Sequence, residues 1–243
     1  MLPRRRVQPL DAHFPPETDC HLEAMAQRPK NPEPRPQPRL YLITPAIVDA
    51  ETFALTLEPA LAAGDVAAVL LRLAPADERS QINRIKAIAP LVQRHDAALL
   101  VDGDTALIAR SGADGAHLSG IDAITDALGA LKPDWIVGAG GLANRHDAMS
   151  AAEGGADYVM FGEPDEQGER PGFETILERV TWWAEVFEAP CVAYAGSLDE
   201  IVRLVEAGAD FVALGDWLWN DPQSVVQTVA ATVPLLRLPE NTA

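Results

Sequence analysis

The sequence has 243 residues, of which 48% are apolar and 23% are charged, and its formal net charge at pH 7 is −17. This length fits one or two domains, and the composition excludes fibrous, collagen-like and disulfide-stapled proteins. Nucleic-acid binding is disfavoured, because the electric field of so acidic a protein repels a polyanion.

The N-terminal segment, residues 1–39, contains nine of the 20 prolines, which block helix and sheet hydrogen bonds. We expect a disordered or polyproline-like tail there. The basic run 4–6 is followed by prolines and acids instead of an apolar segment, so no secretion signal is predicted. No apolar run approaches the ~18 residues that a membrane span requires. Cys20 and Cys191 lie far apart in sequence, which favours a protein of the reducing cytoplasm.

From residue 40 onward, short apolar runs alternate with amphipathic stretches. The runs predict eight strands, at 40–43, 66–71, 98–101, 115–118, 135–137, 158–161, 191–194 and 211–214. The stretches predict helices at about 49–63, 77–95, 104–111, 122–131, 144–154, 173–188, 198–207 and 221–233. Asn220, Asp221 and Pro222 are typical of the capped first turn of the last helix. A short C-terminal tail, 237–243, is expected after it.

Three joints between helix and strand repeat one phrase, at 111–114, 154–157 and 207–210, in which glycine, alanine and aspartate come in that order. Glycine adopts the left-handed conformation that ends a helix at little cost, so these joints are expected to be structural. Eight strand–helix units in about 200 residues predict a single (β/α)8 barrel, a TIM barrel, over residues 40–236. An open, doubly wound sheet is the alternative, but no glycine-rich loop follows the first strand.

In such a barrel, chemistry is carried by the residues that follow the carboxyl ends of the strands. Acids and glycines dominate these positions: Thr44, Arg72, Asp102, Asp104, Ser119, Asp122, Gly138, Gly140, Gly141, Gly162, Glu163, Gly196, Ser197, Gly215 and Asp216.

Three of the acids, Asp102, Asp104 and Asp122, follow two neighbouring strands. Carboxylates are the ligands that Mg²⁺ prefers, so these three are a candidate Mg²⁺ site. The alternative is that the same residues cap the helices that follow them. Arg72 ends an apolar run and is expected to meet either an anion or an acidic neighbour.

The glycines Gly140, Gly162, Gly196 and Gly215 are candidate phosphate-binding positions, since a chain without side chains lets backbone amides approach an anion. A tight turn without any ligand requires the same glycines. His117, inside the fourth predicted strand, is expected to be packed and hydrogen-bonded rather than catalytic.

At these residues the chain resembles the thiamine phosphate synthase family, including its TenI-like branch, from about residue 40 to 235. The similar segments are 40–44, 70–72, 99–118, 154–162, 192–196 and 208–214. The resemblance implies a transferase of thiamine biosynthesis. In the implied reaction, hydroxymethylpyrimidine diphosphate loses pyrophosphate and the resulting cation is captured by the nitrogen of a thiazole phosphate, with Mg²⁺ assisting.

The chain departs from the family pattern at several of these positions. Leu70 and Ala74 stand where the family has glutamine and lysine, and Gly103 stands where it has a metal-binding aspartate. Gly140 and Leu142 replace polar residues after the fifth strand. The acidic segment 163–170 replaces a threonine-rich loop with a lysine, and Asp216 replaces a phosphate-binding serine, with the bulky Trp217 next to it.

Two hypotheses follow for a protein whose ligand is a small molecule. The first is a divergent thiamine phosphate synthase in which Asp102, Asp104 and Asp122 hold Mg²⁺ and Arg72, with Arg170, meets phosphate. The second is a catalytically degenerate relative that binds a small uncharged or cationic molecule or a partner protein. The sequence leaves open whether the chain forms a homo-oligomer.

Overall fold

The computed structural model of the protein describes residues 35–165 and 167–237. Most of the predicted N-terminal tail and nearly all of the predicted C-terminal tail lie outside these residues. The first strand begins at Arg39, one residue before the predicted start of the barrel.

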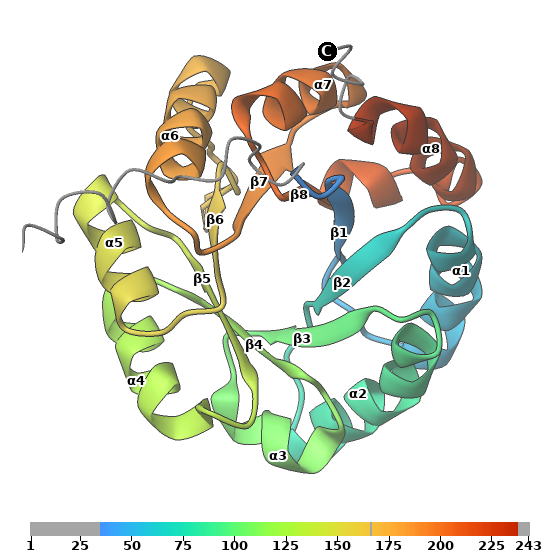
Figure 1. The fold of residues 1–243 in the computed structure, drawn as a ribbon. Helices are drawn as coiled ribbons and strands as arrows, with labels where there is room; N and C mark the ends of the chain where they lie inside the picture. The colour runs from blue at the N-terminus through green and yellow to red at the C-terminus, as the bar shows by residue number, and fades with distance from the viewer. Residues whose placement is uncertain (1–34, 166, 238–243) are drawn as a thin grey trace, which may run out of the picture. The chain divides into compact units, whose positions relative to one another are not determined.

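Eight parallel strands pair in chain order and close into a barrel, because the first strand pairs with both the second and the eighth (Figure 1). The strands are β1 (Arg39–Ile43), β2 (Val66–Leu71), β3 (Ala98–Asp102), β4 (Gly115–Ser119), β5 (Ile136–Gly140), β6 (Tyr158–Phe161), β7 (Cys191–Ala195) and β8 (Phe211–Leu214). The predicted (β/α)8 barrel is confirmed. An open sheet is excluded, since the sheet closes on itself.

The strand ends differ most from the prediction at β5, which runs three residues further, to Gly140. Its second half, Gly138-Ala139-Gly140, has little β propensity of its own. All five residues of β5 nevertheless pair with β4, from Ile136 opposite Gly115 to Gly140 opposite Ser119. Pairing with the neighbouring strand therefore extends β5 beyond what its sequence indicates.

The helices form a ring outside the strands (Figure 1). They are α1 (Ala50–Ala62), α2 (Glu78–Gln93), α3 (Ile108–Ser111), α4 (Ile121–Leu131), α5 (Arg145–Glu153), α6 (Phe173–Val186), α7 (Leu198–Ala207) and α8 (Val225–Thr232). Three short 3₁₀ turns accompany them: η1 (Thr105–Leu107), η2 (Asp216–Trp219) and η3 (Val233–Leu236). Side chains of Asp49, Asp77 and Asn144 accept hydrogen bonds from the first turns of α1, α2 and α5, which explains where these helices begin.

The predicted start of the last helix is wrong. Asp221 accepts a hydrogen bond from the backbone N–H of Gln223, and its own carbonyl accepts one from Ser224. These bonds close a turn, and α8 begins only after it, at Val225. Aspartate before proline therefore opens a turn here and caps no α-helix, because η2 already occupies the chain immediately upstream.

The repeated glycine–alanine–aspartate joints lie at the amino ends of the strands. Gly112 and Gly208 end α3 and α7 with φ of 82° and 112°, as the left-handed prediction requires. Each aspartate of the phrase also has a second use. Asp114, Asp157 and Asp210 accept hydrogen bonds of 2.7, 2.7 and 2.9 Å from the first or second backbone N–H of β3, β5 and β7. The phrase thus ends one helix and fixes the start of the preceding strand.

Side chains alternate between the two faces of each strand. One set fills the barrel interior and includes Tyr41, Leu70, Leu100, Met160 and Tyr194. The other set packs beneath the helices around the fully buried Trp183. Among residues 35–165 and 167–237, no helix is both long and apolar enough to cross a membrane.

Candidate active site

A cavity of about 1050 Å³ lies at the carboxyl ends of the strands, the face on which (β/α)8 barrels carry their chemistry. Its wall is formed by loops that follow β2 to β6, β8 and the segment before α6. The charged residues on this wall are Arg72, Asp102, Glu163, Asp165, Glu169, Arg170, Arg179 and Asp216. Carboxylates outnumber guanidinium groups there, so the mouth shares the acidity of the whole chain.

The alternation along the strands explains which residues meet at the cavity end of the barrel. Six residues continue the inward-facing positions of β2, β3 and β5 to β8 with a spacing of two. They are Arg72, Asp102, Gly140, Gly162, Gly196 and Gly215. Four of these six positions have no side chain, and side chains of neighbouring residues occupy the space at three of them, Gly140, Gly196 and Gly215. The strand period thus gathers one cation, one carboxylate and four glycines at the same level.

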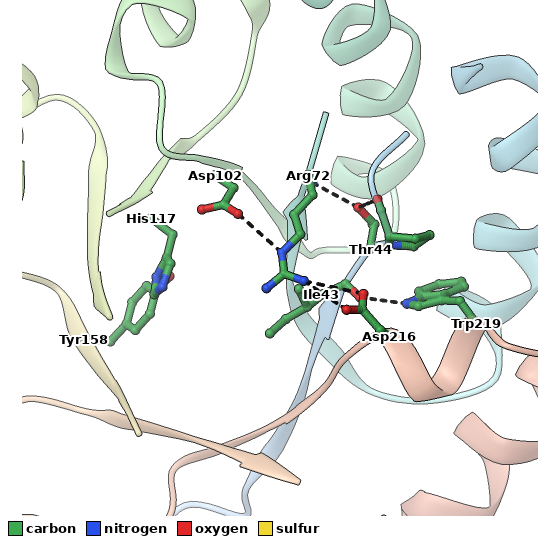
Figure 2. Close-up of polar contacts among 9 residues, drawn as sticks. Ile43, Thr44, Arg72, Asp102, His117, Tyr158, Asp216 and Trp219 are labelled. Atoms are coloured by element: carbon green, nitrogen blue, oxygen red, sulfur yellow. Dashed lines mark hydrogen bonds and ion pairs between the residues drawn. The ribbon is translucent and has the colours of Figure 1, made fainter. Parts of the chain in front are cut away.

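Arg72 lies between two carboxylates (Figure 2). Its Nε is 3.3 Å from Oδ2 of Asp102, and its Nη1 is 3.4 Å from both carboxylate oxygens of Asp216. Its backbone N–H donates to Oγ1 of the fully buried Thr44. The prediction that Arg72 meets an acidic neighbour is confirmed, and it meets two. Its side chain is 28% exposed, which leaves it accessible from the cavity.

The three predicted metal ligands serve different purposes. Asp102 pairs with Arg72, and Asp104 accepts a hydrogen bond from the backbone N–H of Ala106, which caps η1 as the alternative predicted. Asp122 lies in the first turn of α4, whose N-cap is Gly120, so the expectation that Asp122 caps this helix is wrong. In the part of the chain that the structure describes, no three histidine, cysteine or acidic side chains come together as a metal site. The Mg²⁺ site at Asp102, Asp104 and Asp122 therefore stays a prediction.

The pKa of Asp102 is raised by burial, although the neighbouring guanidinium of Arg72 opposes the shift. The desolvation of this carboxyl is therefore only partly compensated by its ion pair. A ligand that draws Arg72 away would leave Asp102 with still less compensation.

Arg170 is held by groups of the barrel itself. Its Nη1 lies 3.0 Å from Oε2 of Glu200, and its Nη2 and Nε donate to the backbone carbonyls of Tyr194 and Gly162. The backbone N–H of Gly196 donates to Oε2 of Glu200 at 2.7 Å. A side chain at Gly196 would overlap the Arg170 guanidinium. Both predicted phosphate contacts, Arg170 and the Gly196 amide, thus have internal partners around Glu200.

Gly140 and Gly215 likewise make room for neighbouring side chains. A Cβ at Gly140 would overlap Nε2 of His117 and lie 2.8 Å from Oε1 of Glu163, and a Cβ at Gly215 would overlap the Tyr194 hydroxyl. Glycine at these two positions is therefore required by packing alone.

The carboxyl group of Glu163 follows β6 and lines the cavity. Its Oε1 accepts a hydrogen bond of 2.6 Å from the backbone N–H of Gly141, in the loop after β5. Burial raises the pKa of Glu163, and the backbone hydrogen bonds and the guanidinium groups of Arg179 and Arg72 act in the opposite direction. The structure gives Glu163 no ion pair among the described residues.

A chain of hydrogen bonds runs through three buried side chains. The hydroxyl of Tyr158 is 2.8 Å from that of Tyr41 and 2.9 Å from Nδ1 of His117. The rings of Tyr158 and His117 stack, and Figure 2 shows these two side chains next to each other. The prediction that His117 is packed and hydrogen-bonded is confirmed. Burial, with a smaller contribution from Arg72, lowers the pKa of His117 to about 4, so its ring is neutral at pH 7.

Either hydroxyl can be the donor in the bond between Tyr41 and Tyr158, and the role of Nδ1 in His117 depends on the tautomer of its ring. The other ring nitrogen of His117, Nε2, lies against Gly140.

Sequence reasoning missed the roles of Tyr41, Tyr158 and Glu200. The two tyrosines belong to predicted strands and were indistinguishable from apolar core residues there. The available signal was Gly138, which pairs with Tyr158 across β5 and β6 and whose missing side chain leaves room for the tyrosine ring.

Comparison with known proteins places these features in context. The profile of the family described as "Thiamine monophosphate synthase" matches residues 40–217. A "Thiamine-phosphate synthase" of Rhodospirillum centenum is 43% identical over 195 residues, which cover 79% of this chain and 94% of the relative. A protein of the same name from Hyphomonas neptunium is 37% identical over 207 residues, covering 82% of this chain and 94% of that one.

Among solved structures, "Thiamine phosphate pyrophosphorylase" of Pyrococcus furiosus superimposes with a TM-score of 0.69. The alignment covers 83% of this chain and 96% of that protein, at 24% sequence identity. At this identity, the structural likeness supports the barrel fold alone.

Proposed function

The chain belongs to the thiamine monophosphate synthase family, and on this premise we propose that it carries out the synthase reaction with an altered active site. In this reaction, the carbon–oxygen bond to the pyrophosphate of hydroxymethylpyrimidine diphosphate breaks. The nitrogen of a thiazole phosphate then forms a bond to the same carbon. The products are thiamine phosphate and pyrophosphate.

The observation that carries this proposal is Arg72 at the wall of the 1050 Å³ cavity, on the catalytic face of the barrel. A partly exposed guanidinium group binds phosphate oxygens with two parallel hydrogen bonds. It also stabilises the negative charge that develops on a departing pyrophosphate. The carboxylates around the cavity have the opposite sign and favour the pyrimidine cation that forms when pyrophosphate leaves.

The protein's own residues account for binding and orientation in this proposal. Asp102 and Asp216 orient Arg72 from opposite sides, and Thr44 holds its backbone. The family relationship implies Mg²⁺, but the three candidate ligands lie in different surroundings. We therefore assign no step of the reaction to the metal.

The alternative is a degenerate barrel that binds an uncharged or cationic small molecule. One observation favours it: the anion-binding groups at the mouth already contact carboxylates of the chain. Asp102 and Asp216 pair with Arg72, Glu200 pairs with Arg170, and Glu163 accepts the Gly141 N–H. A phosphate must displace one of these partners.

Formation of thiamine phosphate by the purified protein tests the proposal. The pyrimidine diphosphate and the thiazole phosphate are supplied together, once with Mg²⁺ and once with a chelator, and the product is quantified by chromatography. Product formation supports the synthase. Absence of product from a folded sample, at an enzyme concentration comparable to that of the substrates, supports the degenerate barrel.

Replacing Asp216 by serine should strengthen the binding of pyrophosphate. Asp216 places a negative charge beside Arg72, where the anion is expected to bind, and repulsion between unit charges at about 4 Å is about 1 kcal/mol in water. The side chain of Asp216 is 62% exposed, so the value for water applies. We therefore expect the Kd for pyrophosphate to fall about fivefold. Isothermal titration with pyrophosphate measures it.

Glu169→Gln is the matched control for Asp216→Ser, because Glu169 is also a carboxylate on the cavity wall and has no contact with Arg72 in the described residues. The control should change the Kd for pyrophosphate by less than about twofold, since its distance and exposure weaken the repulsion. An equal gain in both variants would mean that general acidity, and not the pairing with Arg72, limits anion binding.

A further inference from the structure

Glu163 is a cavity-lining carboxyl group whose charge has no ionic partner. Its hydrogen bonds come from the backbone N–H groups of Gly141 and of Glu163 itself, and no side chain of the described residues donates to it. The three other carboxylates that contact anion-binding groups at the mouth, those of Asp102, Asp216 and Glu200, are each paired with a guanidinium group. A half-buried carboxyl group without such a partner costs free energy, which a ligand with matching donors would recover.

The surroundings of Glu163 fix the position of this carboxyl group. The hydrogen bond from Gly141 holds Oε1 at 2.6 Å, and Gly140 provides the space for it, since a Cβ there would come within 2.8 Å of Oε1. The Nε2 atom of His117 lies against the same glycine. A polar ring nitrogen therefore lies close to the carboxyl group.

Apolar residues also line the cavity that contains Glu163. They are Met160, which belongs to the barrel interior, and Leu142 and Phe161, whose side chains pack mainly beneath the helices. A planar ring would cover the apolar surface while its polar edge meets the carboxyl group.

We propose that Glu163 anchors a subsite for a planar nitrogen heterocycle that carries an amino group next to a basic ring nitrogen. Such an edge pairs with a carboxyl group at two points. The amino group donates to one oxygen, and a single proton is shared between the ring nitrogen and the other oxygen. The pairing has the same geometry whether that proton lies on the ring or on the carboxyl group.

This inference rests on the proposed function and deepens it, because the pyrimidine of the proposed substrate has such an edge. It assigns recognition of the pyrimidine ring to Glu163, a residue of the acidic segment 163–170 by which this chain departs from the family pattern. Arg72, which lines the same cavity, would then contact the phosphates of the same substrate.

The test measures binding of the unphosphorylated hydroxymethyl aminopyrimidine by isothermal titration, which requires neither phosphate binding nor turnover. Glu163→Ala should raise its Kd about 10- to 100-fold, the loss expected for hydrogen bonds to a charged group. Glu163→Gln should lose less than about tenfold, because an amide accepts from the amino group and donates to the ring nitrogen. For the wild-type protein, the same ring with a carbonyl oxygen in place of the amino group should bind at least about tenfold more weakly.

Glu169→Ala is the matched control, since it removes the same charge from the same cavity wall at an exposed position. It should leave the Kd for the aminopyrimidine within about twofold of wild type. The inference is overturned if wild type does not bind the aminopyrimidine, if both alanine variants lose affinity equally, or if Glu163→Ala and wild type bind alike. If Glu163→Ala does not fold, the carbonyl analogue and Glu163→Gln decide the question.

The two proposals fail separately. Tight, Glu163-dependent binding of the aminopyrimidine without any synthase turnover would retain the subsite and reject the synthase. Turnover with an unchanged KM for the pyrimidine diphosphate in Glu163→Ala would retain the synthase and reject the subsite.

Discussion

Replacement of Arg72 by alanine is expected to lower kcat/KM for thiamine phosphate formation by about 100- to 1000-fold, the range seen when one charge-stabilising donor is removed from a transition state. Three guanidinium groups line the cavity in the described residues. That of Arg72 is the one that contacts side chains only, the carboxylates of Asp102 and Asp216. Arg170 donates through all three of its nitrogens, and Arg179 donates to two backbone carbonyls. Steady-state kinetics with the two phosphorylated substrates measures the loss.

Arg110→Ala is the control for Arg72→Ala. Arg110 also pairs with a carboxylate, Glu78, but at an exposed site outside the cavity wall, where an ion pair contributes little to stability. This variant should keep wild-type kinetics. If Arg72→Ala keeps more than about half of the activity, Arg72 is not the anion-binding group, and the reaction must use another cation. If wild type and Arg72→Ala both bind pyrophosphate weakly and with the same Kd, the degenerate barrel is favoured.

The fold could be predicted because its signals are local. Each strand is a short apolar run, and each joint at 111–114, 154–157 and 207–210 ends a helix with a glycine. Local chemistry also explains the failure at the last helix. The residues at 220–222 have the composition of a cap, but the preceding 3₁₀ turn at Asp216–Trp219 places them in a turn instead.

The site could be predicted only in part, because its contacts join distant segments. The strand period correctly placed Arg72, Asp102 and the glycines at the mouth. The pairing of Arg72 with Asp216 spans 144 residues, and nothing in either segment specifies it. The metal prediction treated three neighbouring carboxylates as equivalent, whereas their different neighbours assign Asp102 to an ion pair and Asp104 to a cap.

The glycines at the mouth illustrate a further limit. In the sequence, Gly140, Gly196 and Gly215 are equally consistent with phosphate binding and with tight packing. In the structure, the space at each of them is used by His117, Arg170 and Tyr194 respectively. A glycine in the sequence indicates that another group lies close to the backbone. Whether this group is a ligand or a side chain of the protein is seen only in the structure.

Gly138 should therefore be among the least replaceable residues of the barrel. It lies opposite Tyr158 in the register of β5 and β6, and a Cβ there would overlap the tyrosine ring. The ring cannot move aside without breaking its hydrogen bonds to Tyr41 and His117, all three side chains being buried. We expect Gly138→Ala to lower the free energy of unfolding by about 3 kcal/mol, measured by urea unfolding.

Two further variants separate this steric cause from a general intolerance of alanine. Gly129 lies inside α4, with nothing within 4 Å of an added Cβ, so Gly129→Ala should stabilise the protein by about 0.5–1 kcal/mol. In a protein that already carries Tyr158→Ala, the space above Gly138 is open, and adding Gly138→Ala should then cost less than about 1 kcal/mol. An equal cost in both backgrounds would mean that the strand backbone, and not the tyrosine ring, requires glycine at this position. In that event the ring of Tyr158 would not be the reason for glycine at position 138.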